Sequence, residues 1–268
     1  MFGLQRALLS PFVRCLNYHD VSPNQADDFE RQLRFYTRNF EPVDYEGLMA
    51  LHDGRWRASK PGLILSFDDG LRSHADVVAP LLERHGFVGW FMVPGGFVDS
   101  APEDQRAFAR DHHISHADFD YGDPRIAVTW EDIQRLGRRH VIGCHTWDHQ
   151  RLSADLAPEE LEVQIRDAKR RLEKKLGLEV PVFGWVGGEE WSYSSGAARA
   201  IRNAGFRCSF MTNNRVIQQG SELLQLQRTN VEASDPDAVV RFQVSGLLDI
   251  LYTPKRLRVN KLTATTPS

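Results

Sequence analysis

Cysteine is scarce in this 268-residue chain, where Cys15, Cys144 and Cys208 lie far apart and no CxxC pair occurs. An odd number of widely spaced cysteines argues against a disulfide framework and indicates reduced thiols. Because reduced thiols persist in reducing compartments, we expect a cytoplasmic protein.

Long hydrophobic runs are also missing. The first twenty residues, MFGLQRALLSPFVRCLNYHD, are partly apolar, but Arg6, Pro11 and Arg14 interrupt them. They contain neither the apolar region nor the small-residue cleavage site of a signal peptide, and no later stretch approaches the length of a membrane span. We therefore expect a soluble protein without stable membrane insertion.

The chain has no large excess of charge of either sign. Its 33 basic and 36 acidic residues give a formal net charge of −3. This balance produces no general attraction to nucleic acid or to anionic lipid. The basic clusters at 138–139 and 169–171 have acidic residues around them, which is typical of a solvated helix face. We expect no nucleic-acid partner, and the oligomeric state stays open.

The pattern that is present is an alternation of short apolar strands with amphipathic helices. The expected strands are 13–18, 62–67, 87–93, 140–145, 180–186, 206–211 and 222–229, and the expected helices are 29–40, 73–85, 129–139, 158–176, 194–204 and 235–251. Such alternation implies parallel βαβ units, and the chain length suits one large barrel. The sequence therefore predicts an α/β fold, an open or closed (β/α) barrel.

No repeat and no linker divides the chain, so we predict a single domain over residues 1–268. Its core is expected at about 12–252, and the basic tail at 253–268 is expected to be flexible. Residues 95–128 are rich in Gly, Pro, Asp and His and form the longest stretch expected to be irregular. Loops of that length are commonly lids or disordered segments.

Residues able to do chemistry follow several of the predicted strands. In parallel α/β folds, ligands and catalytic groups gather at the carboxyl ends of the strands. The residues at these ends are Tyr18, His19 and Asp20, then Asp68 and Asp69, then His145 and His149, and finally the Gly-Gly-Glu-Glu run at 187–190. We expect all of them to face one end of the barrel.

His145 and His149 have the i, i+4 spacing that places two imidazoles on one side of a helical turn. Two histidines and one carboxylate leave positions open for water and substrate, as in catalytic zinc sites. The Asp68–Asp69 pair would supply the carboxylate, and the other aspartate would stay free as a base. Alternatively, Asp-Asp-Gly is a simple turn and the histidines are ordinary surface or core residues.

SFDDG at 66–70 together with HTWDH at 145–149 resembles the polysaccharide deacetylase (NodB-homology) family, carbohydrate esterase family 4, over residues 17–232. The resemblance implies a distorted (β/α) barrel and removal of an N-acetyl group from an amino sugar. It implies that Asp68 is the general base, that Asp69, His145 and His149 bind one divalent ion, and that Thr146 braces the loop. Zinc is the first candidate, with Co, Mn, Ni or Fe as alternatives.

The chain departs from this family at two places. The stretch that matches the third motif, 183–188, has no Pro-Tyr pair, although the amide of Gly187 could still bind the oxyanion. No histidine follows His149, so the late histidine that serves as general acid in the family is missing. Asp68 in both roles, or His19, could protonate the leaving amine, and we rank both ahead of Glu189 and Glu190.

Several further positions are candidates for substrate contacts. Arg228 could orient Asp68 or bind an acidic substrate group, or form an ordinary ion pair. Trp185 and Trp191 could stack on a sugar ring, whereas Trp90, inside a strand, is expected in the core. The His-His-x-x-His run at 112–116 is expected to be a solvated loop, with a substrate-covering lid as the alternative.

These features together predict a metal-dependent N-deacetylase with a carbohydrate substrate that carries an N-acyl group. The substrate would be a small nucleotide- or lipid-linked sugar intermediate of surface-glycan (O-antigen-like) biosynthesis. One alternative is a deformylase or another non-peptide C–N amide hydrolase. A second is a catalytically impaired, metal-containing glycan-binding protein.

Overall fold

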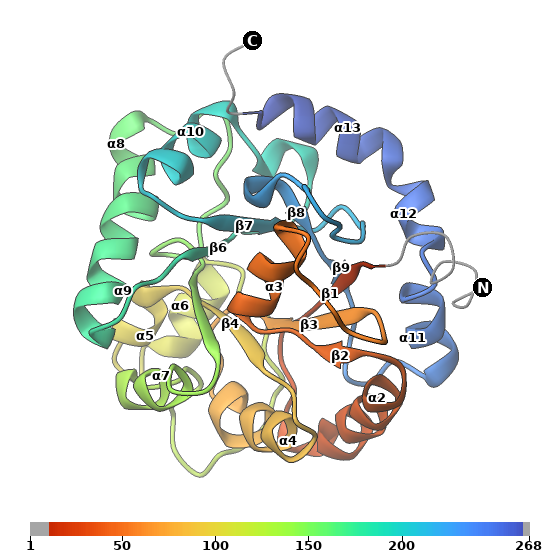
Figure 1. Ribbon diagram of the computed structural model, residues 1–268. Helices are drawn as coiled ribbons and strands as arrows, with labels where there is room; N and C mark the ends of the chain where they lie inside the picture. The colour runs from red at the N-terminus through yellow and green to blue at the C-terminus, as the bar shows by residue number, and fades with distance from the viewer. Residues whose placement is uncertain (1–10, 265–268) are drawn as a thin grey trace.

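Parallel strands form a nearly closed barrel with helices on its outside in the computed structural model, which describes residues 11–264 (Figure 1). The strands are β1 Val13–Tyr18, β2 Glu41–Pro42, β3 Gly62–Phe67, β4 Gly89–Val93, β5 Val141–Cys144, β6 Val182–Gly184, β7 Cys208–Met211, β8 Leu226–Gln227 and β9 Thr229–Asn230. They follow the order β8-β7-β6-β5-β4-β3-β1-β9, and β2 pairs with β3. The predicted barrel is confirmed.

The strands β1 and β3 have the bounds that the sequence predicts. All six residues of each strand are buried, as expected for a parallel strand covered on both faces. They pair in register from Val13 with Gly62 to Tyr18 with Phe67. Both strands therefore end at the same level, and the residues that follow them emerge side by side.

One chain segment joins the two edges of the barrel. Gln227 of β8 pairs with Met211 of β7, whereas Thr229 of β9 pairs with Leu16 of β1. Arg228 is the residue between these two pairings, and it is fully buried. The barrel therefore closes at Arg228.

Most of the helices lie around the outside of the barrel, whereas α3 (Tyr45–His52) lies over the middle of it in Figure 1 and packs Leu48 and Leu51 against residues of the strands. The helices are α2 Ala26–Asn39, α3 Tyr45–His52, α4 Ala79–Arg84, α5 Gly95–Asp99, α6 Gln105–Asp111, α7 Trp130–Leu136, α8 Pro158–Leu161, α9 Ala168–Leu176, α10 Ser195–Asn203, α11 Asp237–Gln243, α12 Leu247–Leu251 and α13 Thr253–Leu262. The predicted helix at 73–85 consists of a π-helical turn, His74–Val78, and α4. The predicted helix at 158–176 consists of α8, a second π-helical turn and α9, and it ends at Gly177 with φ of +68°.

Three sequence predictions are wrong. The stretch 95–128 contains α5 and α6, so it is only partly irregular. The helix expected at 235–251 is interrupted at Gly246, whose φ of +87° separates α11 from α12. The tail expected to be flexible forms α13, because Arg256 turns inward and donates to the carbonyl of Asn214 at 2.6 Å, and Val259 is buried. Residues 265–268 lie outside the described part of the chain.

The part of the chain that the structure describes contains no helix that is both long and apolar enough to cross a membrane. The expectation that the N-terminal residues lack the features of a signal peptide falls partly on residues 1–10, which lie outside the described part of the chain. The assignment of residues 1–268 to a single domain stays a prediction.

Candidate active site

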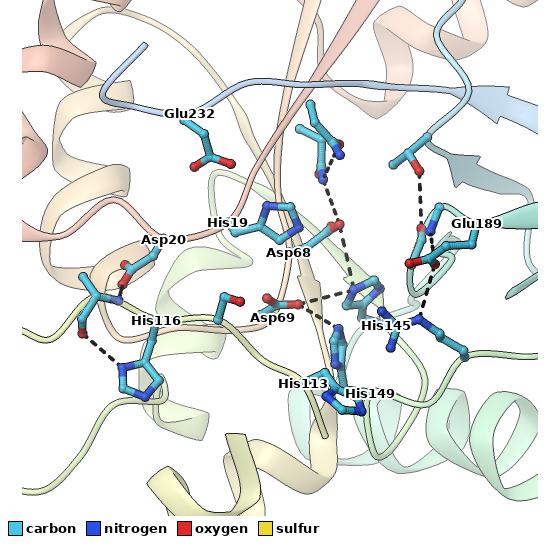
Figure 2. Close-up of a pocket in the computed structure, with 18 of the residues that line it drawn as sticks. His19, Asp20, Asp68, Asp69, His113, His116, His145, His149, Glu189 and Glu232 are labelled. Carbon is cyan, nitrogen blue, oxygen red and sulfur yellow. Dashed lines mark hydrogen bonds and ion pairs between the residues drawn. The ribbon is translucent and has the colours of Figure 1, made fainter. Parts of the chain in front are cut away.

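A pocket of about 690 Å³ opens at the carboxyl ends of the strands. Figure 2 shows that residues from distant parts of the chain point into it. The residues predicted from the sequence that line it are His19, Asp20, Asp68, Asp69, His145, His149, Gly187 and Glu189. The structure therefore brings most of the predicted site together at one end of the barrel.

A tight turn after β3 positions the two aspartates. Asp69 has φ of +83° and Gly70 has φ of +65°, so two consecutive residues adopt the left-handed conformation. Asp69, His113, Thr146 and His149 are four of the five non-glycine residues with positive φ in residues 11–264, and three of them line the pocket. Such strain is commonly concentrated at functional sites.

Asp69, His145 and His149 form a buried cluster whose ligand atoms all lie within 4.8 Å of one another. Oδ1 of Asp69 is 3.0 Å from Nε2 of His149 and 3.5 Å from Nε2 of His145. Burial lowers the pKa of His149, but the charge and hydrogen bond of Asp69 and the carbonyl of His112 together outweigh it and raise this pKa. The cluster therefore favours a positive charge at its centre.

The hydrogen bonds of the two histidines show that this charge can be a metal ion. Nδ1 of His145 lies 2.8 Å from the carbonyl of Gly184, and Nδ1 of His149 lies 2.7 Å from the carbonyl of His112. A carbonyl oxygen only accepts, so both Nδ1 atoms carry hydrogen, and in the neutral form of each ring the lone pair of Nε2 faces Asp69. Oδ1 of Asp69 is buried and receives no hydrogen bond within residues 11–264. Three unshared lone pairs that converge in this way fit a divalent cation.

Asp68 belongs to a separate buried network. Arg228 donates to both of its oxygens, at 2.6 and 2.8 Å, and Nδ2 of Asn17 donates to Oδ2 at 3.0 Å. Oδ2 also lies 3.8 Å from Nε2 of His145. Burial disfavours the ionised carboxyl, but the charge and hydrogen bonds of Arg228 and the charge of His145 together outweigh it and lower the pKa of Asp68. Asp68 is therefore an ionised carboxylate held beside the cluster of Asp69, His145 and His149.

Arg228 forms a buried ion pair with Asp68 and holds both of its oxygens, which agrees with two of the three readings, an ordinary ion pair and an orienting role. The other prediction, that Arg228 binds substrate, is wrong. Its side chain is completely buried behind Asp68 and does not line the pocket. The position at the closure of the barrel directs the guanidinium inward, which the sequence did not reveal.

Trp185 was predicted to contact a sugar ring, and this is also wrong. Its side chain is buried, packs against Phe183 and Tyr193, and donates from Nε1 to Ser209 at 3.3 Å. Trp90 is in the core, as predicted.

The loop after β6 contributes Gly187 and Glu189 to the pocket wall. Burial disfavours ionised Glu189, but backbone amides and Arg151 outweigh it and lower its pKa. A general acid needs a raised pKa instead, so Glu189 does not suit that role. Thr146 is buried and accepts from the amide of Gln150 at 2.9 Å, within the loop that carries His149.

Several site residues escaped the sequence analysis. Asn17 was missed, although a buried polar residue inside an apolar strand is a recognisable signal. The run at 112–116 was expected to be a solvated loop, but its backbone holds His149, and His113 and His116 line the pocket. Asp20 fixes this loop, because its Oδ2 accepts from the amide of Ala117 at 2.7 Å.

The chain is similar to known deacetylases in sequence. The profile of the polysaccharide deacetylase family matches residues 57–209. The chain is also 22% identical over 166 residues to the poly-beta-1,6-N-acetyl-D-glucosamine N-deacetylase of Escherichia coli (strain K12). That match takes in 57% of this chain and 23% of the relative, so the chain spans less than a quarter of the length of that protein.

Solved structures share the fold. The Streptococcus pyogenes deacetylase PplD has a TM-score of 0.67 and 18% identity, covering 87% of this chain and 98% of its own. IcaB from Ammonifex degensii has a TM-score of 0.64 and 19% identity, covering 89% and 98%. At these identities the likeness establishes the shared barrel. Because the family profile covers more than half of the chain, this protein belongs to the polysaccharide deacetylase family.

Proposed function

We propose that this protein is a metal-dependent hydrolase that removes the N-acetyl group from an amino sugar. The observation that carries the proposal is the ionised Asp68 beside the converging lone pairs of Asp69, His145 and His149, all within one pocket. A divalent ion bound by these three side chains, with zinc the first candidate, would polarise the amide carbonyl and activate water.

The residues of the chain divide the remaining work. Asp68 takes the proton of the attacking water, while Arg228 and Asn17 keep its oxygens in place. The backbone amide of Gly187, in the pocket wall, binds the oxyanion. His19, which follows β1 and lines the same pocket, gives a proton to the departing amine.

The proposed substrate is a small nucleotide- or lipid-linked amino sugar, and the proposed location is the cytoplasm. All three cysteines are buried and free, which suits a reducing compartment. The name of the Escherichia coli relative gives a polymer of N-acetylglucosamine as its substrate, so polymer and small substrates should be assayed together. Parallel assays of N-formyl and N-acetyl substrates distinguish a deformylase from a deacetylase.

Metal binding should be measurable without turnover. Protein stripped with a chelator is expected to gain about 2.7 kcal/mol of unfolding free energy when Zn²⁺, Co²⁺ or Mn²⁺ is present at 100 times its Kd. The substitution His149→Ala should abolish this gain because it removes one of the three ligands. His116→Ala is the matched control, since His116 lines the pocket outside the cluster and its loss should leave the gain intact. An equal gain in the His149→Ala protein would contradict the proposed ligand set.

The role of His19 can be separated from that of Asp68 by changing the leaving group. The substitution His19→Gln is expected to slow hydrolysis of an N-acetyl sugar by about 10²-fold, because an amine must be protonated to depart. Hydrolysis of an aryl acetate should change little, because a phenolate departs without a proton. Equal loss on both substrates would show that His19 does not act as the acid and would favour Asp68 in both roles.

A further inference from the structure

Exposed hydrophobic side chains are concentrated on the C-terminal helices. Six of the eight large hydrophobic residues that are exposed within residues 11–264 belong to α11, α12 or α13. We call these six the C-terminal surface: Val239, Phe242, Ile250, Leu251, Leu257 and Leu262. Ile250 and Leu251 are 70% and 68% exposed, and α12 has no buried residue although four of its five residues are apolar.

The exposure of α12 is a fixed feature of the fold. Its only acidic residue, Asp249, points inward and receives two hydrogen bonds from Arg14 of β1, at 2.9 and 2.8 Å. Nη1 of Arg256 donates to the carbonyl of Asp249 at 3.0 Å. The helix is therefore anchored to the barrel by its polar groups, with Leu247 and Leu248 half-buried and Ile250 and Leu251 facing outward.

The same helices are rich in positive charge. Residues 237–262, from the start of α11 to the end of α13, contain five basic and two acidic residues, although the whole chain has a net charge of −3. Of the two acidic residues, Asp249 faces inward and Asp237 pairs with Arg31. Arg241, Arg258 and Lys261 are exposed, and Arg258 forms an ion pair with Glu190. Apolar and basic side chains on one helical surface match the acyl region and the headgroups of an anionic bilayer.

We infer that the C-terminal surface docks on an anionic lipid bilayer without spanning it. Figure 1 shows α11, α12 and α13 following one another along one side of the barrel. Tyr252, which follows α12 directly, and Lys255 of α13 line the catalytic pocket. Docking would therefore hold the pocket beside the bilayer, where a lipid anchor presents its sugar. This choice of a lipid-linked substrate rests on the proposed function, whereas the docking does not.

Vesicle co-sedimentation of the full chain tests the inference. The protein should bind vesicles of phosphatidylcholine with phosphatidylglycerol, bind weakly to phosphatidylcholine alone, and dissociate as salt is added. The double substitution Ile250→Ser with Leu251→Ser should weaken binding by about tenfold or more. Val163→Ser is the matched control, since Val163 is exposed but lies outside the C-terminal surface, and it should bind as the wild type does.

Three results would overturn the inference. They are absence of binding to the anionic vesicles at low salt, equal binding by the double variant, and a wild-type dimer that the double substitution converts to a monomer. The last result would assign the surface to a second copy of the chain. Sedimentation measures binding and needs no turnover. If the protein binds the vesicles but is inactive on every N-acyl sugar, the proposed function is wrong and the docking still holds.

Discussion

Asp68→Asn should lower kcat for N-acetyl sugar hydrolysis by about 10²–10⁴-fold, the range that one general base contributes. The carboxamide keeps the size of the carboxylate and can still accept a hydrogen bond from Arg228, but it cannot take a proton from water. Because Asp68 is not one of the three ligands, metal content should be unchanged. Aryl acetate hydrolysis should fall as well, unlike in the His19→Gln protein, since both reactions need the base.

Steady-state kinetics, metal analysis and circular dichroism together check this prediction. Asp123→Asn is the matched control: Asp123 is an exposed carboxylate that pairs with Arg72 at 2.8 Å and lies outside the pocket, so its loss should leave kcat unchanged. An Asp68→Asn protein with full metal content and near wild-type kcat would remove Asp68 from the role of base.

The part of the site that the sequence predicted consists of side chains carried by strand ends. Asp69 and His145 follow buried strands, and His149 lies four residues after His145, so the topology of the barrel brings them together. The spacing of residues within each of the two motifs is local in the sequence, and such spacing can be recognised without knowing the tertiary structure. The roles of these residues remain predictions.

The part that the sequence did not reveal depends on long-range packing. His149 is held by the backbone of His112, and a backbone carbonyl leaves no signature in the residue type. α13 forms because Arg256 reaches carbonyls more than forty residues away, so its basic composition alone indicated a flexible tail. The net charge of −3 likewise concealed the excess of basic residues in α11, α12 and α13, because averaging over the chain cancels local charge.

Arg228→Met should destabilise the protein by about 3–5 kcal/mol at neutral pH, because it leaves the carboxylate of Asp68 buried without its charge partner. Folding lowers the pKa of Asp68, so its ionised form stabilises the native state above the ordinary carboxyl pKa of about 4, and this stability is lost as the pH falls through the folded pKa. Without Arg228, burial raises that pKa instead. The difference between variant and wild type should therefore shrink in acid.

Denaturant unfolding at several pH values measures this effect. Arg139→Met is the control, because Arg139 forms an exposed ion pair with Glu83 at 3.1 Å and its loss should cost about 0–1 kcal/mol. Arg228→Lys should fall between the two, since an ammonium keeps the charge but cannot donate to both oxygens in parallel. An Arg228→Met protein as stable as the Arg139→Met control at every pH would show that the buried pair does not stabilise the barrel at its closure. A loss of stability at neutral pH that disappears in acid would instead assign the effect to the charge of Asp68. Arg228 would then link the closure of the barrel to Asp68, the base of the proposed reaction.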